Sequence, residues 1–68
     1  MTLSARNHLA GTIEEITHDT ILCHVVGRVG EHLIESVITR RSADELALKA
    51  GDRVTAVVKA TEVMISKP

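Results

Sequence analysis

The stretch Arg40-Arg41-Ser42-Ala43-Asp44-Glu45-Leu46 decides the fold, because the hydrophobic pattern of the chain changes its period there. On both sides of it, apolar residues alternate in the way that strands require. Within it, Ser42 followed by Glu45 three residues later fits the capping box that starts a short helix, and Gly51 fits the exit from that helix. The chain therefore predicts strands, one short helix, and strands again.

Five segments have the composition of short strands. Three precede the helix, at residues 9–17, 20–26 and 32–39, and two follow it, at residues 52–60 and 63–66. The first carries a bulge or bend, since the alternation of Leu9, Gly11 and Ile13 breaks at Ile16. Strands in this order, with the helix between the third and the fourth, predict an all-β fold. We expect one domain over residues 1–68, a small five-stranded β-barrel of the OB type, closed or partly closed.

A chain of 68 residues is near the lower limit for independent folding, since it buries only about 60% of the surface of its unfolded state. Cys23 is the only cysteine, so no disulfide within the chain can stabilise it. The segments 20–26 and 32–39 are apolar on both faces, although one face of a small antiparallel sheet normally meets water. Together these features predict a homo-oligomer whose partner subunit covers the second face.

Charge and composition argue against several classes of partner. The formal net charge is −1 and there is no Phe, Tyr or Trp, so the chain has neither the overall field nor the stacking residues of a nucleic-acid-binding module. The sequence shows neither a leader pattern nor an apolar run long enough to span a membrane. Together with the single thiol, this predicts a cytoplasmic protein. An OB-type nucleic-acid-binding module and a regulatory interaction module remain alternatives.

The sequence offers little for catalysis. Cys23 and His24 are neighbours in a strand, so their side chains point to opposite faces and cannot act as a pair. The histidines lack the spacing of metal sites; they are His8, His18, His24 and His32. We therefore expect a protein that is not an enzyme and has neither catalytic residues nor metal ligands.

Two short segments near the ends of the chain suit a compact anion. Arg6 and Lys59 can neutralise a dianion, and the small residues Ala5 and Ala60 leave their backbone N–H groups unobstructed. Hydroxyl groups that can donate hydrogen bonds to the anion belong to Ser4, Thr39, Ser42 and Thr61. A plainer interpretation is also open, in which Ser42 only caps the helix and the two cations are solvated surface residues.

Four separated blocks in this sequence occur together in one known family. They are Ser4-Ala5-Arg6-Asn7, Ile38-Thr39-x-x-Ser42, Leu46-x-Leu48-x-x-Gly51 and Val57-x-Lys59-Ala60-Thr61-x-Val63-Met64-Ile65. In this order and spacing they resemble the molbindins, the small molybdate-binding proteins of the Mop type in the TOBE/Mop domain family. The resemblance covers nearly the whole chain.

The resemblance implies an OB-like barrel that assembles into a hexamer, a trimer of dimers, and binds molybdate or tungstate at subunit interfaces. Its implied role is storage or homeostasis of intracellular molybdate. The implied oxyanion contacts are Ser4, Ala5 and Arg6 from one subunit and Thr39, Ser42, Lys59 and Ala60 from a neighbour, with Asn7, His8 and Thr61 as further candidates. His8 stands where the family usually has Gln, which puts any contact of that position in doubt and adds an ionisable group.

Overall fold

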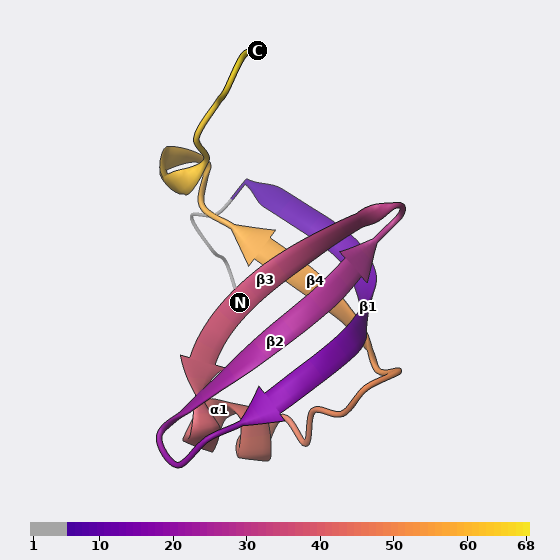
Figure 1. Ribbon diagram of the computed structural model, residues 1–68, viewed down its shortest axis with the longest axis vertical. Coiled ribbons are helices and arrows are strands. Elements are labelled where there is room, and N and C mark those ends of the chain that lie inside the picture. Colours follow the sequence, from indigo (N-terminus) through magenta and orange to yellow (C-terminus); the bar gives the residue numbers. More distant parts are fainter. Residues whose placement is uncertain (1–5) are drawn as a thin grey trace.

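The computed structural model describes residues 6–68, which form four strands and one short α-helix (Figure 1). The elements are β1 (Asn7–His18), β2 (Leu22–Val29), β3 (His32–Thr39), α1 (Arg40–Glu45) and β4 (Arg53–Val58). The strands form one antiparallel sheet in the order β3-β2-β1-β4. The predicted all-β class, with the helix between the third and fourth strands, is therefore confirmed. The strand β2 extends three residues beyond its predicted end, so only Gly30 and Glu31 connect it to β3.

The strand β1 serves both halves of the sheet because it bends in the middle. Its first residues pair with β4 and its later residues pair with β2, and the register to β2 shifts between Ile13 and Glu15. This shift is the bulge that the sequence predicted. At the bend the backbones approach closely, since a Cβ added at Gly11 would lie 2.4 Å from the carbonyl oxygen of Arg28. Glycine is therefore the residue that lets β1 cross against β2 there.

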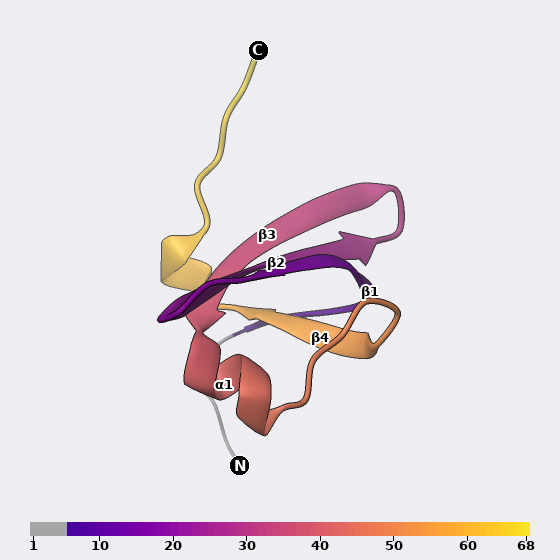
Figure 2. The same ribbon diagram turned by 60° about the horizontal axis from the view of Figure 1, so that its bottom comes forward.

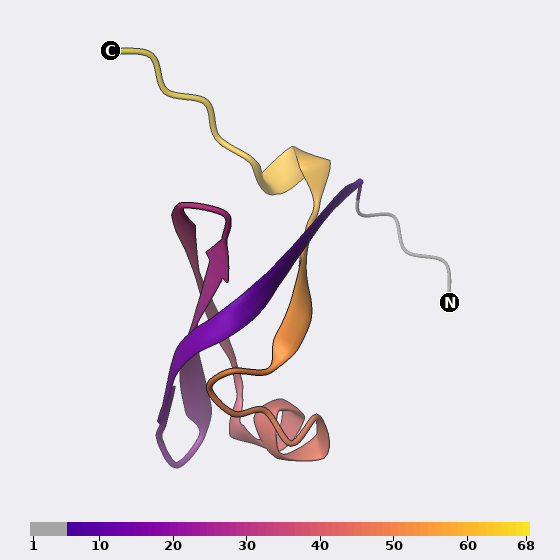
Figure 3. The same cartoon turned by 90° about the vertical axis from the view of Figure 1, so that its right-hand side faces the viewer.

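The sheet is strongly curved, and β3 and β4 form its two edges (Figure 2). Contrary to prediction, residues 63–66 form no strand within this chain. A single 3-10 turn, η1 (Ala60–Glu62), follows β4 instead, and the chain then leads away from the sheet (Figure 3). The side chains of Val63, Met64 and Ile65 are 46%, 92% and 89% exposed. An extended segment becomes a strand only beside another strand, and η1 directs this one away from both sheet edges.

The helix α1 begins earlier than its predicted cap. Thr39 is the N-cap residue, and its Oγ1 accepts a hydrogen bond of 3.0 Å from the backbone N–H of Ser42. Ser42 lies inside the first turn, where its Oγ accepts a hydrogen bond of 2.8 Å from the Thr39 hydroxyl. The prediction of Ser42 as the cap is therefore wrong, because the helix begins three residues earlier and the Thr39 hydroxyl accepts the hydrogen bond from an unpaired N–H of its first turn.

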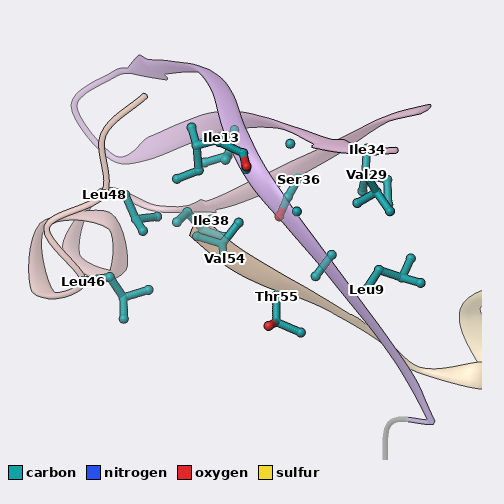
Figure 4. A pocket seen from close by; sticks show the side chains of 15 residues that line it. Leu9, Ile13, Val29, Ile34, Ser36, Ile38, Leu46, Leu48, Val54 and Thr55 are labelled. Carbon is teal, nitrogen blue, oxygen red and sulfur yellow. The ribbon is translucent and has the colours of Figure 1, made fainter. Parts of the chain in front are cut away.

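The hydrophobic core is small for the amount of apolar side chain in the sequence. Among residues 6–68, only Ile13, Cys23 and Ala43 are buried hydrophobic residues. The inner face of the sheet lines an open, apolar hollow of about 200 Å³ (Figure 4). Its walls include Leu9, Val29, Ile34, Ile38, Leu48 and Val54. An open apolar hollow beside exposed apolar residues indicates that the single chain does not complete its own core.

Candidate functional site

Two predicted anion-binding residues meet at one end of the β1–β4 pair. Asn7 and Val58 are Cα partners in the sheet, Arg6 directly precedes Asn7, and Lys59 directly follows Val58. The backbone of Lys59 stays extended, with φ −64° and ψ 131°. The structure therefore brings the backbones of these two cationic residues, which are more than 50 positions apart in the sequence, to the same end of the β1–β4 pair.

Neither cation at this end is neutralised by a carboxylate. Within residues 6–68, no Asp or Glu oxygen lies within 4.0 Å of the charged groups of Arg6 or Lys59. Three other arginines do form ion pairs, with N–O distances of 2.9, 3.2 and 3.2 Å; the pairs are Arg28–Glu14, Arg40–Asp44 and Arg41–Glu45. The cations at the end of β1 and β4 are thus available to an external anion.

The turn that follows Lys59 adds backbone donors. In η1 the N–H of Glu62 donates to the Lys59 carbonyl at 2.9 Å, and the N–H of Val63 donates to the Ala60 carbonyl at 3.4 Å. The N–H groups of Ala60 and Thr61 precede the first of these bonds, so they have no partner within the turn. The methyl side chain of Ala60 leaves room around its N–H. Glu62 supplies the single carboxylate of this turn.

The predicted hydroxyl donors Thr39 and Ser42 lie at the other end of the sheet. Thr39 is paired with Leu22, beside the far end of β1, and the full length of β1 separates it from Arg6. Figures 1 and 3 likewise place α1 and η1 at opposite ends of the molecule. The Thr39 hydroxyl hydrogen is directed to Ser42 Oγ, which leaves the Ser42 hydroxyl hydrogen free to donate. Within one chain, these hydroxyls and Lys59 cannot contact the same ion. The implied division, with Thr39, Ser42, Lys59 and Ala60 from a single neighbour, therefore does not fit the structure, in which Lys59 adjoins Arg6 of its own chain.

The remaining predicted residues are distributed around the first group. Asn7 is half-buried at the start of β1, His8 is exposed and pairs with Val57 of β4, and Thr61 is exposed in η1. Ser4 and Ala5 lie outside the described residues.

One polar pair was missed from the sequence. The buried Cys23 Sγ lies 3.3 Å from Nδ1 of His18, its direct cross-strand partner, whereas sequence reasoning had weighed Cys23 only against His24. The register of the β1–β2 hairpin would have revealed this pair. Within the described part of the chain, no three His, Cys, Asp or Glu side chains are grouped as metal ligands.

The exposed ion pair at the bulge has the clearest electrostatic effect. Arg28 donates hydrogen bonds of 2.9 and 3.2 Å to the Glu14 carboxylate. These bonds, together with the charge attraction, lower the pKa of Glu14 and raise the pKa of Arg28. Both groups therefore remain charged and satisfy each other, and neither is free for a ligand.

Comparison with known proteins identifies the family. A model of the TOBE domain matches residues 3–65. The chain belongs to the TOBE domain family. Molybdenum-pterin-binding protein 1 of Clostridium pasteurianum is 41% identical to this TOBE domain over 66 residues, which cover 96% of this chain and 97% of that protein. The family inferred from the four sequence blocks is thereby confirmed.

Solved structures agree with this assignment. The structure of a molybdate-binding protein from Sporomusa ovata has 39% sequence identity and a TM-score of 0.93, covering 98% of this chain and 100% of that one. The cytoplasmic molybdate-binding protein ModG, with molybdate bound, has 36% identity and a TM-score of 0.81, covering 88% of this chain and 43% of that one. The backbone of this TOBE domain, including the curved sheet and the outward C-terminal segment, therefore follows nearly the same path as the Sporomusa ovata protein.

The structure also bears on membrane association. In the part of the chain that it describes, no helix has the length and apolar character needed to cross a bilayer.

Proposed function

We propose that this chain binds molybdate, or tungstate, at interfaces between copies of itself in a homo-oligomer and so stores or buffers molybdate in the cytoplasm. It acts as a binding protein rather than an enzyme. The observation that carries the proposal is the unneutralised pair Arg6 and Lys59 at one end of the β1–β4 pair. Two relatives that are similar over almost their full length support the choice of ion: the molybdate-binding protein of Sporomusa ovata and the molybdenum-pterin-binding protein 1 of Clostridium pasteurianum.

The chemistry of this end suits a tetrahedral dianion. Such an ion accepts hydrogen bonds and donates none at neutral pH, so cations, hydroxyls and backbone N–H groups satisfy it without competition. Charge-assisted hydrogen bonds are about twice as strong as neutral ones. A buried dianion without opposite charge would be strongly unfavourable, which is why Arg6 and Lys59 must both approach it. The Ala60 N–H adds a neutral donor from the adjoining turn.

The separation of the donors supports a site shared between subunits. Ser42 and Lys59 lie at opposite ends of one chain, so an ion contacted by both requires at least two copies. Ser4 and Ala5 would join Arg6 in this site, with Asn7, His8 and Thr61 nearby. A hexamer built as a trimer of dimers provides several symmetric interfaces for such sites.

The C-terminal segment gives this assembly a physical basis. Its apolar side chains Val63, Met64 and Ile65 are exposed, while the apolar hollow and the edges of β3 and β4 are open. Insertion of this segment from a neighbouring copy would add the fifth strand and close the OB-like barrel. The same step would bury apolar surface on both partners.

Isothermal titration of the purified oligomer tests the ion assignment. Molybdate and tungstate should bind saturably, and sulfate and phosphate should not compete at this site. Lys59→Ala removes a charge-assisted hydrogen bond worth about 1.5–3 kcal/mol, which corresponds to a loss of roughly 10- to 150-fold in affinity. Arg28→Ala is the control, because Arg28 already pairs with Glu14 and is not among the proposed oxyanion contacts.

Two results would contradict the proposal. Sulfate that displaces molybdate from the site at Lys59 with equal affinity would remove the ion assignment. A stable monomer that retains the oxyanion, detected by light scattering coupled to size-exclusion chromatography, would remove the shared site.

A further inference from the structure

The outer face of the β1–β4 pair has a composition unlike the rest of the sheet. Exposed and half-buried residues alternate along β4, and the exposed ones include Arg53 and Thr55. On β1 their direct cross-strand partners are Thr12 and Ala10, which are also exposed. By strand alternation these four residues share one face of the pair. Together with Gly11 and Val54 they line an open groove, and Thr12 and Thr55 also border the apolar hollow. The face presents a cation, two hydroxyls and a methyl group.

Arg53 carries an unpaired charge in this groove. Within residues 6–68, no carboxylate oxygen lies within 4.0 Å of its guanidinium. The nearest acidic residue in the sequence, Asp52, accepts a hydrogen bond of 3.0 Å from the Lys49 backbone N–H. Glu14, near the same end of β4, is engaged by Arg28 through two hydrogen bonds. Neither carboxylate pairs with Arg53, since Glu14 is neutralised by Arg28 and Asp52 is turned to the Lys49 N–H, so the guanidinium of Arg53 is available to a ligand.

We propose that this groove, defined by Ala10, Thr12, Arg53 and Thr55, is a binding site for a small tetrahedral oxyanion of the phosphate and sulfate class. It is separate from the end that carries Lys59. Arg53 begins β4 and Lys59 follows its last residue, a distance of about 20 Å along an extended strand. The proposal therefore does not depend on the molybdate site.

The geometry of the ribbon suits such an ion. Direct cross-strand partners such as Thr12 and Arg53 have Cβ atoms about 5 Å apart, so one ion can contact both side chains. The planar guanidinium donates two parallel hydrogen bonds to two oxygens. The hydroxyls of Thr12 and Thr55 can donate to the remaining oxygens, and Ala10 leaves space beside them.

The same openness defines the selectivity of the groove. In the single chain it has no enclosing walls that could sort ions by size, so sulfate, phosphate and molybdate should all bind wherever this face stays open in the oligomer. Binding to an exposed charge is screened by salt, and the affinity should fall as ionic strength rises. Both properties distinguish this groove from a buried, size-selective site between subunits.

The test is an amide NMR titration of the intact oligomer with inorganic phosphate and then sulfate, at constant ionic strength set with chloride. We expect saturable shifts at Thr12, Arg53 and Thr55. Arg53→Gln should abolish them, and Thr12→Val should weaken phosphate binding several-fold. Arg41→Gln, which changes an 88% exposed arginine on α1, is the matched control and should leave the shifts unchanged.

The outcomes separate this site from the proposed molybdate site. Lys59→Ala should retain the phosphate response at Arg53 even though it loses molybdate affinity. Shifts that never saturate, or that persist in Arg53→Gln, would show only a diffuse ion atmosphere and would overturn the proposal. The loss of both responses in Lys59→Ala, with the fold intact, would also overturn it.

Discussion

Replacing Met64 and Ile65 by serine should dissociate the oligomer while leaving each subunit folded. The two side chains are 92% and 89% exposed in the single chain, so they contribute almost nothing to its own core. If a neighbouring copy buries them, each contributes about 1.5–3 kcal/mol, or roughly 3–6 kcal/mol for the pair. At 1.4 kcal/mol per tenfold change, the dissociation constant should rise by about two to four orders of magnitude.

Native mass spectrometry over a dilution series measures this change directly. Serine keeps the backbone able to pair, so the double variant tests the apolar side chains rather than the hydrogen bonds of a strand. Ile21→Ser, at a residue that is 73% exposed in the β1–β2 turn, is the control for loss of any exposed apolar side chain. A double variant that dissociates at the same concentration as the original protein would refute the reasoning. Equal weakening by Ile21→Ser would show that the effect is not specific to the C-terminal segment.

Three further changes test the fold. Ile13→Ala should lower the free energy of unfolding by about 2–5 kcal/mol, because its side chain is 2% exposed; a urea titration showing no more effect than Ile21→Ala would contradict this. Thr39→Ala should lower it by about 1 kcal/mol through loss of the helix cap, and Thr39→Ser should restore it in the same titration. Glu14→Gln removes the carboxylate whose pKa Arg28 lowers in the folded state. The ion pair stabilises the fold fully above the ordinary carboxyl pKa of about 4.3, and this stabilisation is lost as the pH falls through the lower pKa of the folded state. Melting curves should therefore differ at neutral pH and converge in acid; an equal difference at both pH values would exclude the linkage.

Much of the fold followed from local patterns. The segment 32–39 alternates apolar residues between turn signals and is a strand with those bounds in the structure. The break after Ile13 in the first strand is a bulge, as predicted. The helix was placed correctly between two strands, although its cap was assigned three residues late. Two hydroxyls, at Thr39 and Ser42, were both competent as caps, and only the path of the chain leaving β3 selects between them.

The candidate site followed from the sequence only in part. Residue chemistry and family resemblance named Arg6 and Lys59, but nothing local shows that they adjoin within one chain while Ser42 lies at the far end. That arrangement depends on β4 returning to pair with β1 and not with β3. The groove around Arg53 was not anticipated, since Thr12 and Arg53 become neighbours only through the same pairing.

The sequence by itself determined four of the five predicted strands, the helix between them, the bulge and the family. Each of these depends on side-chain periodicity, backbone preference or residue chemistry within a few positions. Only the tertiary structure decided which donors share an end of the molecule, which charges remain unpaired, and where residues 63–66 lead. These three properties depend on the order and register of strands that are distant in the sequence. The strand order and register are selected by the free energy of the whole sheet and not by any local segment. In the single chain, that selection leaves an open apolar hollow and an outward apolar segment.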